Sequence, residues 1–164
     1  MEGNIQLNRK AKEIIDGNKY MVVSTSDKDG GPWGATVLYV YDEESELFFF
    51  FSDLESLHSR NIIENPRVSL TIFNAGSPIG EYKGIQVEGN AHLVGKDKLD
   101  LAFNLYSKRI FPNANAKQLE RLRLKDYYME SSKSKFFYVE ATHTYLANGA
   151  GRVEVDVIDL AGIR

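Results

Sequence analysis

The sequence predicts a mainly β protein, built as an antiparallel barrel with helices at its periphery. Three observations predict this class: short segments alternate apolar and polar residues with the period of a strand, turn residues separate most of them, and helical periodicity is confined to a few stretches. Short turns join antiparallel strands, whereas parallel strands need a longer crossover. The 164 residues contain no repeat, low-complexity tract or linker, so we predict a single domain over residues 1–164.

The clearest strand begins with Trp33, Ala35 and Val37, which alternate with the other residues up to position 41. The turn "DEES" then leads back into a second strand over 46–53, and the two form a predicted hairpin. About seven strands are expected in all. The others cover residues 20–27, 67–75, 85–95, 136–147 and 152–160, the last two around a predicted hairpin turn at "NGAGR". The residues expected in or near the core are Val22, Val37, Phe49, Leu70 and Val87.

Helices are predicted at the edges of this barrel. Residues 5–16 are amphipathic and are followed by Gly17, a common stop residue. A short helix over 54–65 ends before Pro66, because the residue that precedes a proline disfavours the helical conformation. Apolar residues recur at helical spacing over 99–110, and a weaker pattern continues over 117–129.

Composition excludes several classes of function. The net charge is −3 without a long run of one sign, so no nucleic-acid partner is expected. The chain has no cysteine, which rules out a disulfide and a thiolate nucleophile. The N-terminal segment lacks an apolar core, and no apolar run approaches the roughly 20 residues that span a bilayer. We therefore expect a cytoplasmic protein without membrane association.

The sequence also lacks the common catalytic patterns. The three histidines, His58, His92 and His143, lie in separate segments without metal-ligand spacing, so no metal site is predicted. A serine nucleophile elbow, paired catalytic carboxylates and a Walker loop are absent. No catalytic residue is assigned.

The strongest candidate site is the stretch "FFFFSDLESLHSRNIIENPRVSL", which places hydroxyls and cations between two apolar strands. A phosphate group needs such donors, and the start of a helix adds free N–H groups and a favourable dipole. Ser56 and Arg60, four residues apart, are expected on one face of the predicted helix, and His58 and Asn61 on another. The alternative is an ordinary polar connection with a helix cap.

The order of these segments resembles the pyridoxamine 5′-phosphate oxidase-like FMN-binding split barrels. The hairpin, the short helix with "RNIIENPRVSL", and the later strand "YKGIQVEGNAHLV" all follow that family's pattern. The segment "AFNLYSKRIFPNA" is similar to a subgroup of small bacterial members. The resemblance covers most of residues 18–147. It implies a six-stranded split barrel and a homodimer with FMN in the cleft between the subunits.

The resemblance also assigns site residues. Many members of the family place a phosphate-binding lysine where this chain has His58, and Arg60 or Arg67 is available to supply the missing charge. The cofactor-binding residues that the resemblance and the residue pattern together predict are Ala35, Thr36, Val37, Phe50, Phe51, Ser52, Ser56, His58, Arg60 and Asn61.

The function implied is that of a small FMN-dependent oxidoreductase that exchanges electrons with a small-molecule donor or acceptor. The complete pyridoxamine phosphate oxidase activity is not expected, because the final segment "RVEVDVIDLAGIR" lacks the Trp that this enzyme carries near its C-terminus. Two alternatives stay open. One is a carrier of flavin, haem or a deazaflavin without turnover, and the other is a structural barrel without a cofactor.

Overall fold

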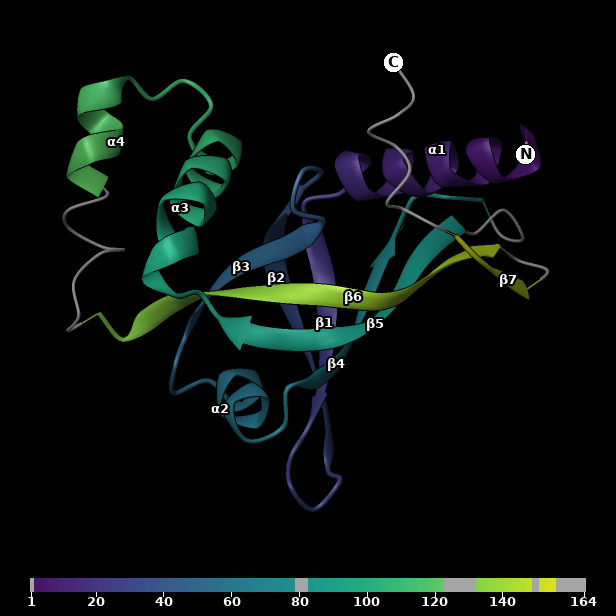
Figure 1. Ribbon diagram of the computed structural model, residues 1–164, viewed down its shortest axis with the longest axis horizontal. Coiled ribbons are helices and arrows are strands. Elements are labelled where there is room, and N and C mark those ends of the chain that lie inside the picture. The colour runs from purple at the N-terminus through teal and green to yellow at the C-terminus, as the bar shows by residue number, and fades with distance from the viewer. Residues whose placement is uncertain (1, 79–82, 123–131, 149–150, 156–164) are drawn as a thin grey trace.

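A computed structural model describes residues 2–78, 83–122, 132–148 and 151–155 of the chain. It contains an antiparallel sheet of seven strands in the order β3-β2-β1-β4-β5-β6-β7, and an additional pairing of β3 with β6 closes the first six strands into a barrel. Figure 1 shows the strands wrapped around a common centre with the helices outside. The predicted class, a mainly β six-stranded antiparallel barrel with peripheral helices, is confirmed, and β7 is an extra strand.

The element bounds agree with the predicted order of strands and helices. The helices are α1 (Glu2–Gly17), α2 (Leu57–Glu64), α3 (Lys96–Ile110) and α4 (Ala116–Leu122). The strands are β1 (Tyr20–Ser26), β2 (Pro32–Asp42), β3 (Leu47–Asp53), β4 (Arg67–Phe73), β5 (Lys83–Leu93), β6 (Ser134–Asn148) and β7 (Gly151–Glu154). Parts of the predicted segments 117–129 and 152–160, and of the "NGAGR" turn, lie outside the described residues.

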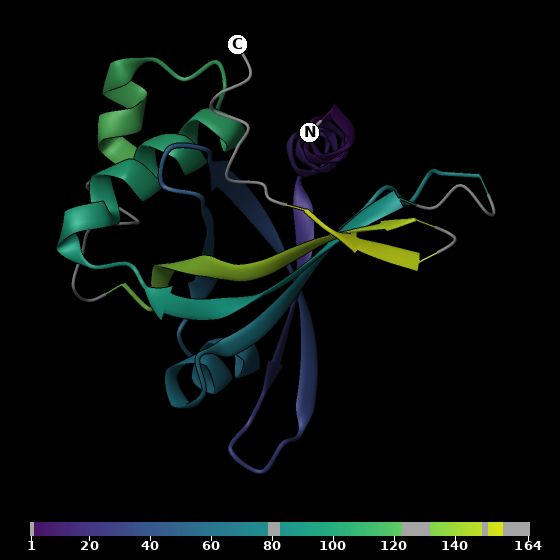
Figure 2. The ribbon, with the colours of Figure 1, turned by 45° about the vertical axis from the view of Figure 1, so that its right-hand side comes forward.

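The helices lie at different places around the barrel. In Figure 1, α1 and α2 lie at opposite ends of the barrel. Figure 2 shows α3 and α4 together on one side of it. The side chain of Arg109 on α3 donates a hydrogen bond to the carbonyl oxygen of Asn18, which ties α3 to the connection between α1 and β1.

Two hydrophobic clusters result from this arrangement. The first fills the barrel and includes Leu70, Val87 and Phe50, and the second lies between α3 and the outer wall of the barrel and includes Phe49 and Phe103. Four consecutive phenylalanines on β3 are therefore buried or half-buried on both faces of the strand. Such a run packs well only where both faces of a strand are covered.

Four of the five predicted core residues are buried, and Val22 is the exception. Val37, Phe49, Leu70 and Val87 are at most 7% exposed, whereas Val22 is half-buried. The interior positions of β1 are Met21 and Val23 instead. Because successive side chains of a strand point to opposite faces, a shift of one residue places Val22 on the outer face of the barrel.

Candidate functional site

A compact group of hydroxyls and one imidazole lies where β3 ends and α2 begins. Ser56 is the N-cap residue of α2, with an extended backbone (φ −65°, ψ 148°), and its side chain accepts a hydrogen bond from the N–H of Ser59. Its Oγ also lies 2.7 Å from the carbonyl oxygen of Asp53 and 2.8 Å from Ser59 Oγ. These contacts fix Ser56 at the junction, and Ser59 beneath it is fully buried. We call Ser52, Ser56, His58 and Ser59 the hydroxyl cluster.

His58 completes the hydroxyl cluster. Its Nε2 atom lies 2.6 Å from Ser52 Oγ and 3.3 Å from Ser56 Oγ. Its ring centroid is 6.5 Å from that of Phe50, which is buried in the barrel. The side chain is half-buried, and this burial lowers the pKa of His58 below its ordinary value of about 6.5. The imidazole is therefore neutral at pH 7, and the hydroxyl cluster carries no formal charge.

The side chains of the two other polar residues predicted on α2 make no hydrogen bond to this cluster. Asn61 is buried and donates from Nδ2 to Thr25 Oγ1 on β1, at 3.0 Å, so it attaches the helix to the barrel. Arg60 is exposed, and within the described ranges its guanidinium makes no hydrogen bond or ion pair. Ser56 and Arg60 were expected within one helix; Ser56 is instead the N-cap, and its carbonyl oxygen accepts a hydrogen bond from the N–H of Arg60 at 3.1 Å.

The residues predicted to flank a flat ring have different environments. On β2, Thr36 is exposed, Ala35 is half-buried and Val37 is 7% exposed. On β3, Phe50 is fully buried inside the barrel, and half-buried Phe51 packs on Phe136 under α3 with ring centroids 4.8 Å apart. The side chains of Val37 and Phe50 therefore support the barrel wall from inside, and any contact of theirs with a ligand is restricted to the backbone.

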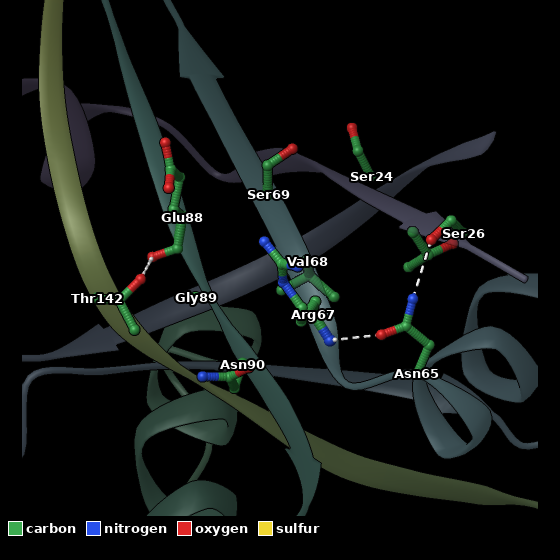
Figure 3. Close-up of a pocket in the computed structure, with 11 residues that line it drawn as sticks. Ser24, Ser26, Asn65, Arg67, Val68, Ser69, Glu88, Gly89, Asn90 and Thr142 are labelled. Atoms are coloured by element: carbon green, nitrogen blue, oxygen red, sulfur yellow. Dashed lines mark hydrogen bonds between the residues drawn. The ribbon is translucent and has the colours of Figure 1, made fainter. Parts of the chain in front are cut away.

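A second feature, which the sequence did not predict, is a polar cleft of about 490 Å³ on the outer face of the sheet (Figure 3). None of the ten predicted cofactor residues lines it. The lining residues are Ser24, Thr25, Ser26, Asn65, Arg67, Val68, Ser69, Glu88, Gly89, Asn90 and Thr142. A sequence signal does exist for part of it, since Ser24, Ser26 and Ser69 alternate with the buried residues of their strands, most of which are apolar.

The described residues contain neither a metal-binding cluster nor a membrane-spanning helix. No group of three or more His, Cys, Asp or Glu side chains is placed to hold a metal ion in the described ranges. In the part of the chain that the structure describes, no helix is both long and apolar enough to cross a membrane.

A comparison with known protein families shows which family this barrel belongs to. The profile of the pyridoxamine 5′-phosphate oxidase family matches residues 7–146. The chain belongs to this family. The match covers the barrel and the hydroxyl cluster, as well as the polar cleft. The resemblance inferred from the order of the segments is therefore confirmed.

Individual relatives are more distant. A UPF0306 protein of Yersinia pseudotuberculosis is 34% identical over 82 residues, which are 50% of this chain and 55% of the relative. This chain thus spans about half the length of the curated relatives it matches. A haem-binding protein of Mycobacterium smegmatis has a TM-score of 0.70 at 17% identity, over 95% of this chain and 60% of that one. A haem storage protein of Vibrio cholerae has a TM-score of 0.61 at 18% identity, over 82% and 89%. At these identities the two structures share the fold alone.

Proposed function

We propose that the protein binds FMN, with the hydroxyl cluster holding the phosphate group, and that it acts as a small flavin-dependent oxidoreductase. The observation that carries the proposal is the convergence of Ser52 Oγ, Ser56 Oγ and His58 Nε2 within 3.3 Å of one another at the start of α2. Hydroxyls and an imidazole can donate to phosphate oxygens, and the free N–H groups of a helix start add to them.

The donor set fits a phosphate group, although it differs from the lysine that many family members have at this position. A neutral imidazole donates one hydrogen bond and becomes a cation when a nearby dianion raises its pKa. The residues that would hold the phosphate are Ser52, Ser56 and His58, and the outer surface of β2 around Thr36 would flank the ring. Bound flavin supplies the electron transfer, and the protein supplies position and electrostatics. The electron donor and acceptor would be small molecules.

A carrier of haem is the second candidate, and one observation favours it. His58 is half-buried and its pKa is lowered, and neutral imidazole is the form that ligates haem iron. Two solved structures of the same fold are described as a haem-binding protein and a haem storage protein. In this chain, however, the Nε2 atom of His58 already contacts two serine hydroxyls, which suits a phosphate ligand better than an iron atom.

The test is a titration of the purified protein with FMN, riboflavin and haemin, followed by absorbance and flavin fluorescence. We expect FMN to bind at least about tenfold more tightly than riboflavin, because riboflavin lacks the phosphate and each charged hydrogen bond contributes roughly 1.5–3 kcal/mol. Ser52→Ala should reduce this preference, while Ser45→Ala, in the turn between β2 and β3, serves as the matched control. Equal affinity for both flavins would contradict the phosphate assignment. Tight haemin binding that is lost in His58→Ala would favour the carrier.

We further propose that the protein is a homodimer. Tyr20 on β1 is 59% exposed and Phe73 on β4 is 42% exposed. These strands pair antiparallel with Val22 opposite Thr71, so Tyr20 and Phe73 lie two positions further along, next to each other at one edge of the outer face. Exposed aromatic residues on adjacent strands are typical of the centre of an interface.

Light scattering at micromolar concentration should therefore give twice the monomer mass, for an interface of at least about 1,200 Å² in total. The double variant Tyr20→Ser, Phe73→Ser should shift the mass toward the monomer. Ile63→Ser, which removes a 57% exposed apolar residue from α2, is the control and should leave the mass unchanged. A monomeric parent, with or without FMN, would refute the dimer.

A further inference from the structure

The polar cleft lies at the opposite end of α2 from the hydroxyl cluster. Ser56 caps the first turn of α2, whereas Asn65 caps its last turn and lines the cleft. With a rise of about 1.5 Å per residue, the nine-residue separation places the two features roughly 13 Å apart. The cleft is therefore distinct from the hydroxyl cluster. It lies on the same outer face as Tyr20 and Phe73, and its Ser24 is opposite Gly34 of β2, two residues from Thr36.

The backbone beside the cleft is shaped by a β-bulge. The register between β5 and β6 shifts between Glu88 and Gly89, and Thr142 is the residue of β6 left without a partner in the ladder. The hydroxyl of Thr142 donates to the carbonyl oxygen of Glu88 at 3.0 Å, which secures the bulge. A side chain at Gly89 would collide with the carbonyl oxygen of Glu140, so the strands approach very closely here. Bulges re-aim side chains next to binding sites, and this one presents Glu88 and Thr142 to the cleft.

Among the described residues that line the cleft, Arg67 is the one cation and Glu88 the one anion, and most of the others carry neutral hydroxyl or amide groups. Arg67 is on β4, between β1, which contributes Ser24, and β5, which contributes Glu88 and Asn90. Figure 3 shows Arg67 among these side chains, with Asn65 on one side and Glu88 on the other. Ser24 lies directly opposite Ser69 in the β1–β4 register. In the described part of the chain, the guanidinium of Arg67 forms no ion pair, although Glu88 lies on the adjacent strand.

These features select a class of ligand. An exposed guanidinium beside serine hydroxyls matches an oxyanion such as a phosphate group. The carboxylate of Glu88 and the amide of Asn90, further along β5, match the hydroxyl groups of the same molecule, and the negative charge of Glu88 disfavours a second anionic group. The volume of about 490 Å³ is within the range of small-ligand sites, which is roughly 300–1,000 Å³. We propose that the cleft binds a small polyol that carries one phosphate group.

The test is calorimetric titration of the full chain, saturated with FMN, with glucose 6-phosphate as the probe. Inorganic phosphate, glucose and fructose 1,6-bisphosphate are the comparison ligands. We expect the monophosphate to bind more tightly than all three. Arg67→Ala should weaken it by about ten- to a hundredfold, since a charge-assisted hydrogen bond is lost. Glu88→Gln should improve binding of the bisphosphate relative to the monophosphate. Arg9→Ala, which removes an exposed arginine from α1, is the charge-matched control and should have no effect.

Three results would overturn the proposal. One is equal binding of glucose 6-phosphate and inorganic phosphate to the parent, because the polyol would then make no contact. Another is equal binding of the probe to the parent and to Arg67→Ala. The third is displacement of the probe by FMN in unsaturated protein, because the cleft would then belong to the cofactor site. Failure of FMN to bind at all leaves this test intact, since it can be run on the FMN-free protein.

Discussion

Replacement of Phe50 by Ala is expected to lower the free energy of unfolding by about 3–5 kcal/mol, the usual cost of truncating a fully buried phenylalanine. Phe50 is 0% exposed and stacks on Phe137, with ring centroids 5.2 Å apart and an angle of 8° between the rings. The two residues are directly opposite each other on β3 and β6, the pair of strands that closes the barrel. The truncation therefore removes both buried area and a packed aromatic pair at the closing seam.

The measurement is equilibrium unfolding in urea at fixed protein concentration, with circular dichroism as the signal. Phe111→Ala is the matched control, because it deletes the same side chain at a position that is 38% exposed at the end of α3, and it should cost less than half as much. Equal costs for both variants would mean that the seam between β3 and β6 is not closed in solution. The ring of Phe50 also lies beside that of His58, so the variant should weaken FMN binding as well.

The elements of this fold could be predicted from the sequence because the strand and turn signals are local. The run from Trp33 to Tyr41 alternates as a strand does, and Pro66 ends α2 as expected. The face of β1 could not be assigned in the same way, because the consecutive apolar residues in "YMVV" give no alternation to distinguish Val22 from Val23. Which of the two side chains faces the barrel interior is decided by the pairing of β1 with β2 and β4. This pairing joins residues far apart in the sequence, so a local pattern cannot predict it.

The candidate sites also differ in whether a local sequence pattern or long-range strand pairing brings their residues together. Ser52, Ser56 and His58 fall within seven consecutive residues, so a local motif was enough to bring them together. The start of α2 was predicted three residues too early, so Ser56 was expected inside the helix although it is the N-cap. The polar cleft was missed because its lining comes from separate strands and becomes continuous only through the sheet order β1-β4-β5-β6.

The substitution of His58 by Ala is expected to weaken FMN binding by about ten- to a hundredfold, and His58→Lys should bind FMN at least as tightly as the parent. The first expectation follows from the loss of one charge-assisted hydrogen bond, worth roughly 1.5–3 kcal/mol. The second follows because a lysine is charged at pH 7, whereas burial lowers the pKa of His58 and keeps the free imidazole neutral. Arg60→Ala should have a smaller effect than His58→Ala, because Arg60 is exposed and its guanidinium makes no hydrogen bond to the hydroxyl cluster.

The pH dependence separates this role from a structural one. The pKa of His58 is lowered in the free protein, and a bound phosphate dianion raises it, so FMN binding takes up a proton between the two pKa values. FMN affinity should therefore increase as the pH falls through the pKa that His58 has in the complex toward its lowered pKa in the free protein. His58→Lys should show a flat profile over that range, because lysine remains charged throughout. If His58→Ala and Arg60→Ala both bind FMN like the parent, and the parent's profile is flat, the segment between β3 and β4 is an ordinary polar connection that caps α2.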